Sequence, residues 1–255
     1  RRIDDKSVLR LIRRYLAAGA MDRGVVIERH EGTPQGGPLS PLLANVLLDE
    51  VDLALERRGH RFVRYADDCN VYVRSRRAGE RVLAQLRWLY DRLHLRINDA
   101  KTAVADVTER TFLGFGFGFD REGNVRRKIA GKALARFKQR IRAMTRRSAG
   151  RSLAQIAERL RAYVPGWKGY FRLAQTPVAF LDLDKWLRHR LRAVQLKHWR
   201  SGTTTFRALR ALGVSHDDAA RIAACDGRWW YTSGKLMNRA LTVAYFDRLG
   251  VPRLS

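Results

Sequence analysis

Hydrophobic residues recur at helical spacing in several stretches of the first half of the chain. The spacing predicts helices over residues 7–18, 39–55 and 79–93, the first of them behind an N-cap serine, Ser7. Runs rich in β-branched and aromatic residues predict short strands between and after these helices. The predicted strands cover residues 25–27, 61–65, 69–73, 103–107, 112–119 and 125–129. We expect the second and third of these strands to form a hairpin, and the last two to pair.

From residue 130 onward the pattern is helical. Helices are predicted over residues 131–147, 151–163 and 177–200, and shorter helices follow as far as residue 249. Strands mixed with helices, followed by helices alone, predict an α+β domain and then an α-helical domain.

The charge of the chain narrows the class of partner. The 255 residues carry a formal net charge of +26, and 45% of them are hydrophobic, so the chain has the apolar residues that a disordered basic tail lacks. Residues 126–200 hold 21 basic and three acidic residues. Such a surface repels itself unless a polyanion binds it, which points to nucleic acid.

Membrane and disulfide-rich classes are excluded by simple counts. No apolar stretch approaches the roughly 18–20 residues of a membrane span, and the N-terminus lacks the apolar segment of a signal peptide. The two cysteines, Cys69 and Cys225, are too few for a disulfide scaffold or a four-ligand zinc site. We therefore expect a protein of the reducing cytoplasm with no membrane partner.

The segment Tyr65-Ala66-Asp67-Asp68 carries the sharpest candidate chemistry. Two adjacent carboxylates at the tip of a hairpin repel each other, and a divalent cation relieves that repulsion. Hard oxygen ligands suit Mg²⁺, and two such ions can clamp the attacking and leaving oxygens of phosphoryl transfer. The alternative is that aspartate simply favours turns.

Three other segments add to this hairpin. In the loop 32–38, glycines allow close backbone approach to a ligand and Gln35 offers a neutral donor and acceptor, although the prolines also suit a plain helix-entry loop. In the segment 95–102, Lys101 either neutralises or protonates a leaving pyrophosphate or is an ordinary surface residue. Glycines in the strand 112–117 let a partner pack closely, unless this is simply a core strand.

In this order, the four segments resemble the reverse transcriptases encoded by group II introns, and the resemblance spans nearly the whole chain. It implies that Asp67 and Asp68 bind catalytic Mg²⁺ ions and that Lys101 assists the leaving group. It also implies that Leu113 and Gly114 form the primer grip. The residues that it implies for contact with the incoming nucleotide and the template are Pro34, Gln35, Gly36, Tyr65 and Ala66.

The basic segment resembles the thumb of these enzymes, also called the maturase or X domain, which grips RNA. Its sequence over residues 165–171 is typical of that domain. Aromatic residues such as Trp167, Tyr170 and Trp186 suit stacking on RNA, but the core of a helical bundle accounts for most of them. The cations are the stronger candidates for RNA contact: Lys168, Arg172, Arg188, Arg190, Arg192 and Arg200.

Two features of the family are missing from the sequence. A two-metal polymerase needs a further carboxylate on a strand before the glutamine loop, whereas Asp4 and Asp5 precede a helix. The fingers are missing as well. We therefore expect an α+β chain that is the C-terminal part of a right-hand polymerase, with an antiparallel palm sheet. It comprises a partial palm over residues 1–125, a basic α-helical thumb or maturase domain over 126–200, and a helical tail over 201–255.

The resemblance implies an RNA-directed DNA polymerase that also binds group II intron RNA to assist splicing and mobility. Its expected partners are intron RNA, an RNA template with a DNA primer, a DNA target and dNTPs, with a second copy of the chain as a further candidate. Its expected place is the cytoplasm of a bacterium, at the nucleoid. Two alternatives stay open: a non-catalytic RNA-binding maturase and a truncated remnant. If Arg1 is the true start, polymerisation by this chain alone should fail.

Overall fold

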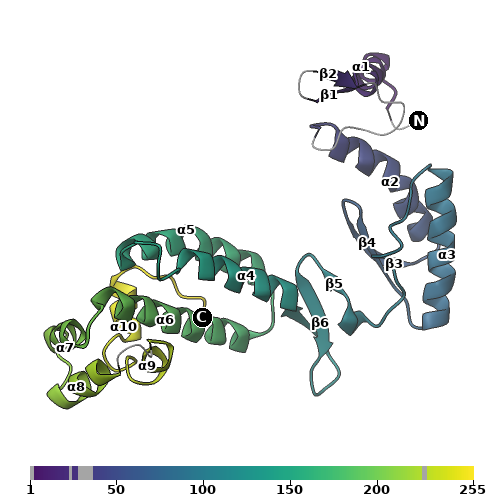
Figure 1. Cartoon of the computed structure of the whole chain (residues 1–255). Helices are drawn as coiled ribbons and strands as arrows, with labels where there is room; N and C mark the ends of the chain where they lie inside the picture. The colour runs from purple at the N-terminus through teal and green to yellow at the C-terminus, as the bar shows by residue number, and fades with distance from the viewer. Residues whose placement is uncertain (1–2, 23–24, 28–36, 226–228) are drawn as a thin grey trace. The chain divides into compact units, whose positions relative to one another are not determined.

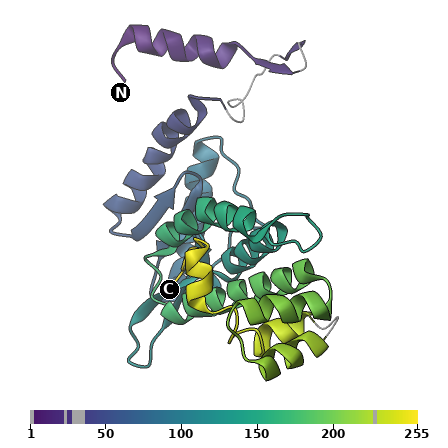
Figure 2. The ribbon, with the colours of Figure 1, turned by 90° about the vertical axis from the view of Figure 1, so that its left-hand side faces the viewer.

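The computed structural model describes residues 3–22, 25–27, 37–225 and 229–255. The chain divides into two compact units, Arg1–Ala105 and Asp106–Ser255 (Figures 1 and 2). The first unit mixes strands with helices, and the second begins with a small sheet and continues as helices. This arrangement confirms the predicted α+β class with a helical C-terminal region.

The first helix starts one position before its predicted N-cap. Helix α1 (Lys6–Ala17) is capped by Asp5, whose carboxylate accepts hydrogen bonds from the N–H groups of Ser7 at 2.7 Å and Val8 at 3.2 Å. Both serine and aspartate are good caps, and here the aspartate lies where the free N–H groups can reach it. Strands β1 (Ala20–Asp22) and β2 (Val25–Ile27) follow as an antiparallel pair.

A hairpin and two helices form the core of the first unit. Helix α2 (Ser40–Arg57) and helix α3 (Arg76–Arg92) pack with the antiparallel strands β3 (Arg61–Tyr65) and β4 (Asp68–Tyr72). The predicted hairpin is therefore confirmed. The buried residues of this core are Leu48, Val51, Leu55 and Val82, with Phe62, Cys69, Val71 and Tyr90 among those packed against them.

The strand predicted over residues 103–107 is wrong. All of these residues are described, and they lead as coil into a short 3₁₀ helix, Val107–Glu109. Val104 lies against Gly79 of α3, where an added Cβ would come within 2.6 Å of the Val104 Cγ1 atom. Val104 thus packs on a helix. A half-buried residue between exposed neighbours gives the same alternating pattern in a coil segment as in a strand.

The second unit opens with a three-stranded antiparallel sheet. Strand β5 (Thr111–Phe112), strand β6 (Phe115–Phe119) and strand β7 (Val125–Ile129) lie in the order β5-β6-β7. The predicted pairing of the last two strands is confirmed, but the single strand predicted over 112–119 is interrupted by a tight turn at Leu113 and Gly114. This turn is the predicted primer grip.

Helices make up the rest of the second unit (Figure 1). They are α4 (Gly131–Met144), α5 (Leu153–Phe171), α6 (Pro177–Trp199), α7 (Gly202–Ala211), α8 (His216–Ala224), α9 (Trp229–Lys235) and α10 (Val243–Arg248). Helix α5 continues eight residues beyond its predicted end at 163, through Pro165, because Trp167 and Phe171 pack into the core of the unit. The largest wholly buried side chains include Phe137, Ile141, Leu160, Leu187, Leu191 and Phe246.

Within the described part of the chain, every helix is too short or too polar to cross a bilayer.

Candidate active site

The two adjacent aspartates lie at the tip of a tight hairpin. Tyr65 pairs with Asp68, which leaves a loop of two residues, Ala66 and Asp67. Ala66 has a φ of 52°, in the left-handed region that two-residue hairpin loops require and that costs a non-glycine residue about 1–2 kcal/mol. The side chains of Tyr65, Asp67 and Asp68 are exposed around this turn. The hairpin therefore presents both carboxylates to solvent on a backbone that needs support.

Arg64 supplies that support. Its Nε donates to the Asp52 carboxylate at 2.8 and 3.0 Å. Its Nη1 donates to the side-chain oxygen of Asn45 at 2.8 Å and to the backbone carbonyl of Ala66 at 3.0 Å. Only 12% of the Arg64 side chain and 18% of the Asp52 side chain are exposed, and the hydrogen bond that Arg64 donates to Asp52 raises the pKa of Arg64. A charged clamp thus ties the turn to helix α2.

Two groups beneath the hairpin stay neutral near physiological pH. Burial raises the pKa of the Cys69 thiol to about 11, with a further contribution from the charge of Asp52. Burial is also the main cause that raises the pKa of Tyr90. A thiol with a raised pKa is a poor nucleophile and a poor metal ligand, so the chemistry of this hairpin belongs to its carboxylates.

The donor set of the hairpin suits Mg²⁺. This ion is usually held by one or two carboxylates together with substrate phosphates and water, rather than by a cage of protein ligands. Asp67 and Asp68 offer such a pair. Among the residues that the structure describes, no group of three or more His, Cys, Asp and Glu side chains gathers in one place, so the hairpin can provide part of a two-metal site.

The remaining residues predicted for this site lie on other segments. Lys101 is exposed and ends a turn in which the N–H groups of Lys101 and Thr102 both donate to the carbonyl of Asn98 at 3.0 Å. The predicted nucleotide and template contacts Pro34, Gln35 and Gly36 lie outside the described residues.

The predicted primer grip is also a two-residue hairpin loop. Leu113 and Gly114 have φ values of 50° and 78° and join a Phe112–Phe115 pair. The hydroxyl of Tyr170 donates to the Leu113 carbonyl at 3.0 Å. A Cβ at Gly114 would lie 3.1 Å from Cζ of Phe171. The sequence motif that ends helix α5 therefore holds this turn through an aromatic contact and one hydrogen bond.

The six predicted RNA-contacting cations divide by their exposure. Arg172 and Arg200 are exposed, and Arg190 is half-buried. Lys168 is half-buried, and its Nζ lies 3.4 Å from the carbonyl oxygens of Arg253 and of Ser255.

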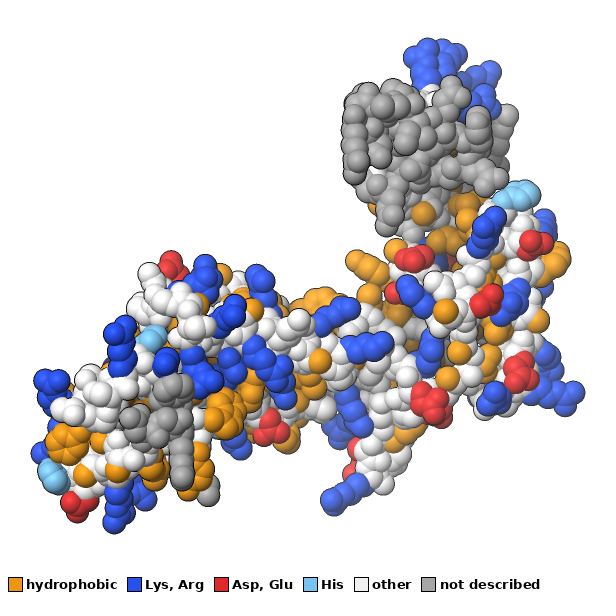
Figure 3. All heavy atoms as spheres, in the orientation of Figure 1, with side chains coloured by type: hydrophobic (Ala, Val, Ile, Leu, Met, Phe, Trp, Pro, Cys, Tyr) orange, Lys and Arg blue, Asp and Glu red, His pale blue; other side chains and the backbone are white. Residues whose placement is uncertain are grey.

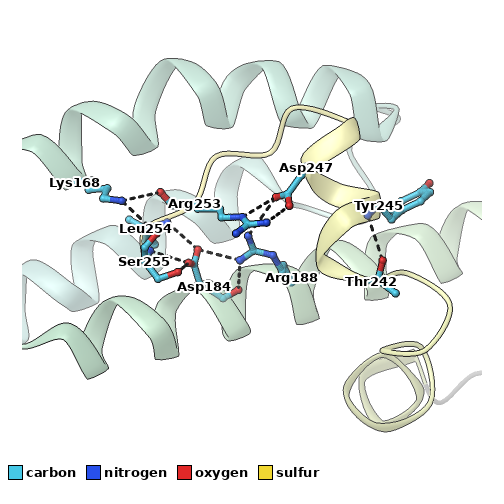
Figure 4. Close-up of polar contacts among 9 residues, drawn as sticks. All are labelled: Lys168, Asp184, Arg188, Thr242, Tyr245, Asp247, Arg253, Leu254 and Ser255. Carbon is cyan, nitrogen blue, oxygen red and sulfur yellow. Dashed lines mark hydrogen bonds and ion pairs between the residues drawn. The ribbon is translucent and has the colours of Figure 1, made fainter.

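Two of the predicted RNA contacts, Arg188 and Arg192, are buried in the described structure. Arg188 is 4% exposed and Arg192 is 8% exposed. Arg188 pairs with Asp184 at 3.0 Å (Figure 4), and Nε of Arg192 donates to the Leu241 carbonyl at 2.9 Å. Burial lowers the pKa of Arg192 to about 10, aided by the neighbouring charge of Arg188. Helix α6 is surrounded by other helices, so these arginines belong to the interior.

Asp184 joins this interior network to the end of the chain (Figure 4). Its carboxylate accepts the N–H of Leu254 at 3.0 Å, the N–H of Ser255 at 2.9 Å and the hydroxyl of Ser255 at 2.6 Å. Burial alone would raise the pKa of Asp184, but these hydrogen bonds and the charge of Arg188 together lower it. Asp247 pairs with Arg253 beside them.

Sequence reasoning missed the residues that hold the two turns. Arg64 could have been found, because it occupies an inward position of the alternating strand β3, where a charge needs a partner. Asn45 and Asp52 lie within the helix predicted over residues 39–55, and helical spacing alone does not indicate the partner of either side chain. Tyr170 was assigned to packing or stacking, since nothing in the sequence indicates where its hydroxyl points.

Comparison with known families covers both units. The model of the family "Reverse transcriptase (RNA-dependent DNA polymerase)" matches residues 2–117. The model "Group II intron, maturase-specific domain" matches residues 134–213.

Individual relatives match shorter segments. The chain is 43% identical over 58 residues to "Protein YkfC" of Escherichia coli (strain K12), which is 23% of this chain and 15% of that protein. It is 45% identical over 51 residues to "Group II intron-encoded protein LtrA" of Lactococcus lactis subsp. cremoris, which is 20% of this chain and 8% of that protein. The two family matches follow each other in the order in which the hairpin and the helical unit occur. The chain therefore combines a region of the reverse transcriptase family with a region of the group II intron maturase-specific family.

Proposed function

We propose that this chain is part of an RNA-directed DNA polymerase of a group II intron, which also binds the intron RNA to assist splicing and mobility. The observation that carries the polymerase proposal is the clamped hairpin with its two exposed carboxylates, Asp67 and Asp68. In this proposal residues 1–125 form the partial palm, residues 126–200 the thumb or maturase domain and residues 201–255 the tail. The proposed place of action is the bacterial cytoplasm, at the nucleoid.

The aspartates of the hairpin would hold Mg²⁺, the ion that this family uses. Bound Mg²⁺ would neutralise charge on the phosphates of the incoming dNTP and lower the barrier to phosphoryl transfer. Tyr65 and Ala66 would lie along the nucleotide and the template, and Lys101 would stabilise the leaving pyrophosphate by its charge or a proton. The same role beside the nucleotide and the template is proposed for Pro34, Gln35 and Gly36.

The turn of Leu113 and Gly114 would hold the end of the DNA primer. Tyr170 donates a hydrogen bond to the carbonyl of Leu113, and the ring of Phe171 packs against Gly114. Because these contacts already hold the turn, it can position a DNA strand without first being ordered. Preorganisation of this kind reduces the entropy that binding must overcome.

Intron RNA and the DNA target would bind the cationic surface of the helical unit. Figure 3 shows Lys and Arg side chains spread over the visible face of its helices, with few Asp and Glu side chains between them. Among the predicted contacts we retain Arg172, Arg190 and Arg200, and we retain Lys168 as a residue shared with the tail.

A second candidate function is a non-catalytic RNA-binding maturase. It is favoured by the fact that, among the described residues, no third His, Cys, Asp or Glu side chain joins the two carboxylates of the hairpin in a possible metal site. In that case the hairpin would serve as scaffold.

Primer extension on an RNA template, with and without Mg²⁺, distinguishes the two. In the complete polymerase of which this chain is proposed to be part, the parent is compared with Asp67→Asn and with Asp91→Asn, which alters an exposed carboxylate of helix α3. The polymerase proposal expects Mg²⁺-dependent extension by that parent and by Asp91→Asn, and a loss of about a hundredfold or more for Asp67→Asn.

RNA binding is measured on the same three proteins. Tight RNA binding without any extension would favour the non-catalytic maturase for this chain. Extension that survives Asp67→Asn would contradict the role assigned to the hairpin.

A further inference from the structure

Three cations surround one indole ring on the second unit. Nζ of Lys138 lies 5.8 Å from the centre of the Trp186 ring, Cζ of Arg142 lies 5.6 Å from it, and Cζ of Arg190 lies 5.5 Å from it. Lys138 and Arg142 are one turn apart on helix α4, and Trp186 and Arg190 are one turn apart on helix α6. The ring attracts each cation and so brings like charges close to one another. We call these four residues the Trp186 cluster.

Hydrogen bonds to Thr145 hold Arg190 in position. Its Nε donates to the hydroxyl of Thr145 at 2.8 Å, and its Nη2 lies 3.4 Å from the Thr145 carbonyl. Thr145 is completely buried, and its hydroxyl in turn donates to the carbonyl of Ile141 at 2.7 Å. These contacts lie at the C-terminal end of α4, where the helix dipole attracts a cation. The guanidinium is thus preorganised and keeps part of its surface open.

The cluster lacks acidic partners. Throughout the described part of the chain, no carboxylate forms an ion pair with Lys138, Arg142 or Arg190. The sequence contains no Asp or Glu between Glu122 and Glu158. Burial lowers the pKa of Arg190, and the charges of Arg142 and Arg147 lower it further. Crowded cations of this kind raise the free energy of the unliganded protein, and an anion relieves that repulsion.

We propose that Lys138, Arg142 and Arg190 form a binding site for phosphate groups of an RNA backbone, with Trp186 and Thr145 holding the cations in position. This inference rests on the proposed RNA-binding function and locates one contact site for it. Guanidinium groups match phosphate oxygens in pairs. Because Trp186 is half-buried and already covered by cations, the site contacts phosphates and reads no bases.

Fluorescence anisotropy with a labelled RNA stem-loop, measured over a range of salt concentrations, tests the site. Arg142→Gln and Arg190→Gln should each weaken binding about fivefold or more at low salt and lower the slope of log affinity against log salt by about 1. The matched control is Arg136→Gln, an exposed arginine on another side of the same helix. It should change the affinity by less than about twofold.

Two further measurements keep the test independent of folding. Arg142 is exposed, so its variant remains informative if Arg190→Gln fails to fold. Thr145→Val removes the hydrogen bond to Arg190 and changes no charge. It should weaken binding less than Arg190→Gln does and leave the slope of log affinity against log salt unchanged.

The outcomes separate this site from the general proposal. RNA binding that is unchanged in Arg142→Gln and in Arg190→Gln would overturn the site and leave RNA binding to another surface. Failure of the parent chain to bind RNA would overturn the proposed RNA-binding function itself. A loss that depends on the RNA sequence would contradict a phosphate site. The assignment to RNA would be contradicted if the parent bound duplex DNA as tightly as the RNA and the variants lost affinity for both to the same extent.

Discussion

The aspartate hairpin and the Leu113–Gly114 turn have nearly the same backbone but different support. Each is a two-residue hairpin loop whose first residue is a non-glycine in the left-handed region, Ala66 at 52° and Leu113 at 50°. In each, a side chain donates to the carbonyl of that first residue at 3.0 Å. At the aspartate hairpin the donor is a charged guanidinium that is itself held by a carboxylate and an amide. At the Leu113–Gly114 turn it is a phenol, in a cluster of aromatic rings.

The difference matches the roles proposed for the two turns. The proposed metal site at the aspartate hairpin uses both exposed carboxylates, and the support of that hairpin comes from the charged Arg64 on its inner face. The proposed primer grip offers its backbone, so apolar rings can pack directly against Gly114. Strained turns are common at functional sites, and they persist where the surroundings hold them. The following variants measure how strongly the neighbouring side chains stabilise each turn.

Asp52→Ala should have the largest effect, because it leaves the mostly buried Arg64 without its carboxylate. We expect a loss of about 3 kcal/mol in the free energy of unfolding of the first unit. Hydrogen exchange of the amides in residues 61–72, together with urea unfolding, measures it. Glu56→Ala, on an exposed position of the same helix, should change little. An equal effect of the two variants would show that Arg64 is not a clamp.

Gly114→Ala should rank second. The substitution places a side chain at a φ of 78° and brings its Cβ to 3.1 Å from Phe171, which we expect to cost about 2–3 kcal/mol. Gly123→Ala is the matched control, since Gly123 has a φ of 81° and nothing within 4 Å of an added Cβ. It should cost only the backbone strain, about 1 kcal/mol. Urea unfolding that gives the same value for both would mean that Phe171 does not restrain the turn.

Tyr170→Phe should have a smaller effect. It removes the hydrogen bond to Leu113 and keeps the ring, and water can reach the carbonyl because Tyr170 is exposed. The expected loss is about 0.5–1 kcal/mol. Tyr72→Phe, in another exposed tyrosine, of the first unit, serves as the reference for removing a hydroxyl. A loss for Tyr170→Phe as large as that for Asp52→Ala would contradict the ranking of the two supports.

Acid should affect the second unit through Asp184, with no change at neutral pH. The native pKa of Asp184 lies below its ordinary value of 3.8, so the unfolded chain takes up the proton first as the pH falls. The stabilisation is therefore complete well above pH 3.8 and is lost as the pH falls through the lower native pKa. Urea midpoints measured across this range should fall more steeply for the parent than for Asp184→Asn. Asp182→Asn, an exposed neighbour, should follow the parent.

The sequence predicted the elements of this structure well where patterns are local. The hairpin, the helices and the turn at the tip of the hairpin follow from alternation, helical spacing and turn residues. The strand predicted over residues 103–107 was wrong because Val104 packs on Gly79, a contact between distant segments. The predicted end of helix α5 was wrong because the aromatic packing of Trp167 and Phe171 outweighs the helix-breaking tendency of Pro165.

The candidate site was predictable only in its exposed chemistry. Asp67 and Asp68 are recognisable because two carboxylates stand together between strands. The burial of Arg188 and Arg192 was not predictable, because helix α6 is polar on several sides and its spacing does not tell which arginines face the core. The clamp by Arg64 depends on where a side chain from one strand meets another helix, and that information is not local.

The most direct test of the central claim is the binding of a divalent metal to the hairpin. Mn²⁺, a paramagnetic substitute for Mg²⁺, is titrated into the isotope-labelled chain while the amide signals are followed by NMR. We expect selective broadening of the signals of Tyr65, Ala66, Asp67 and Asp68, retained in Asp91→Asn and lost when both hairpin aspartates are replaced by asparagine. Broadening that is absent from these residues, or that persists without the two carboxylates, would contradict the central claim.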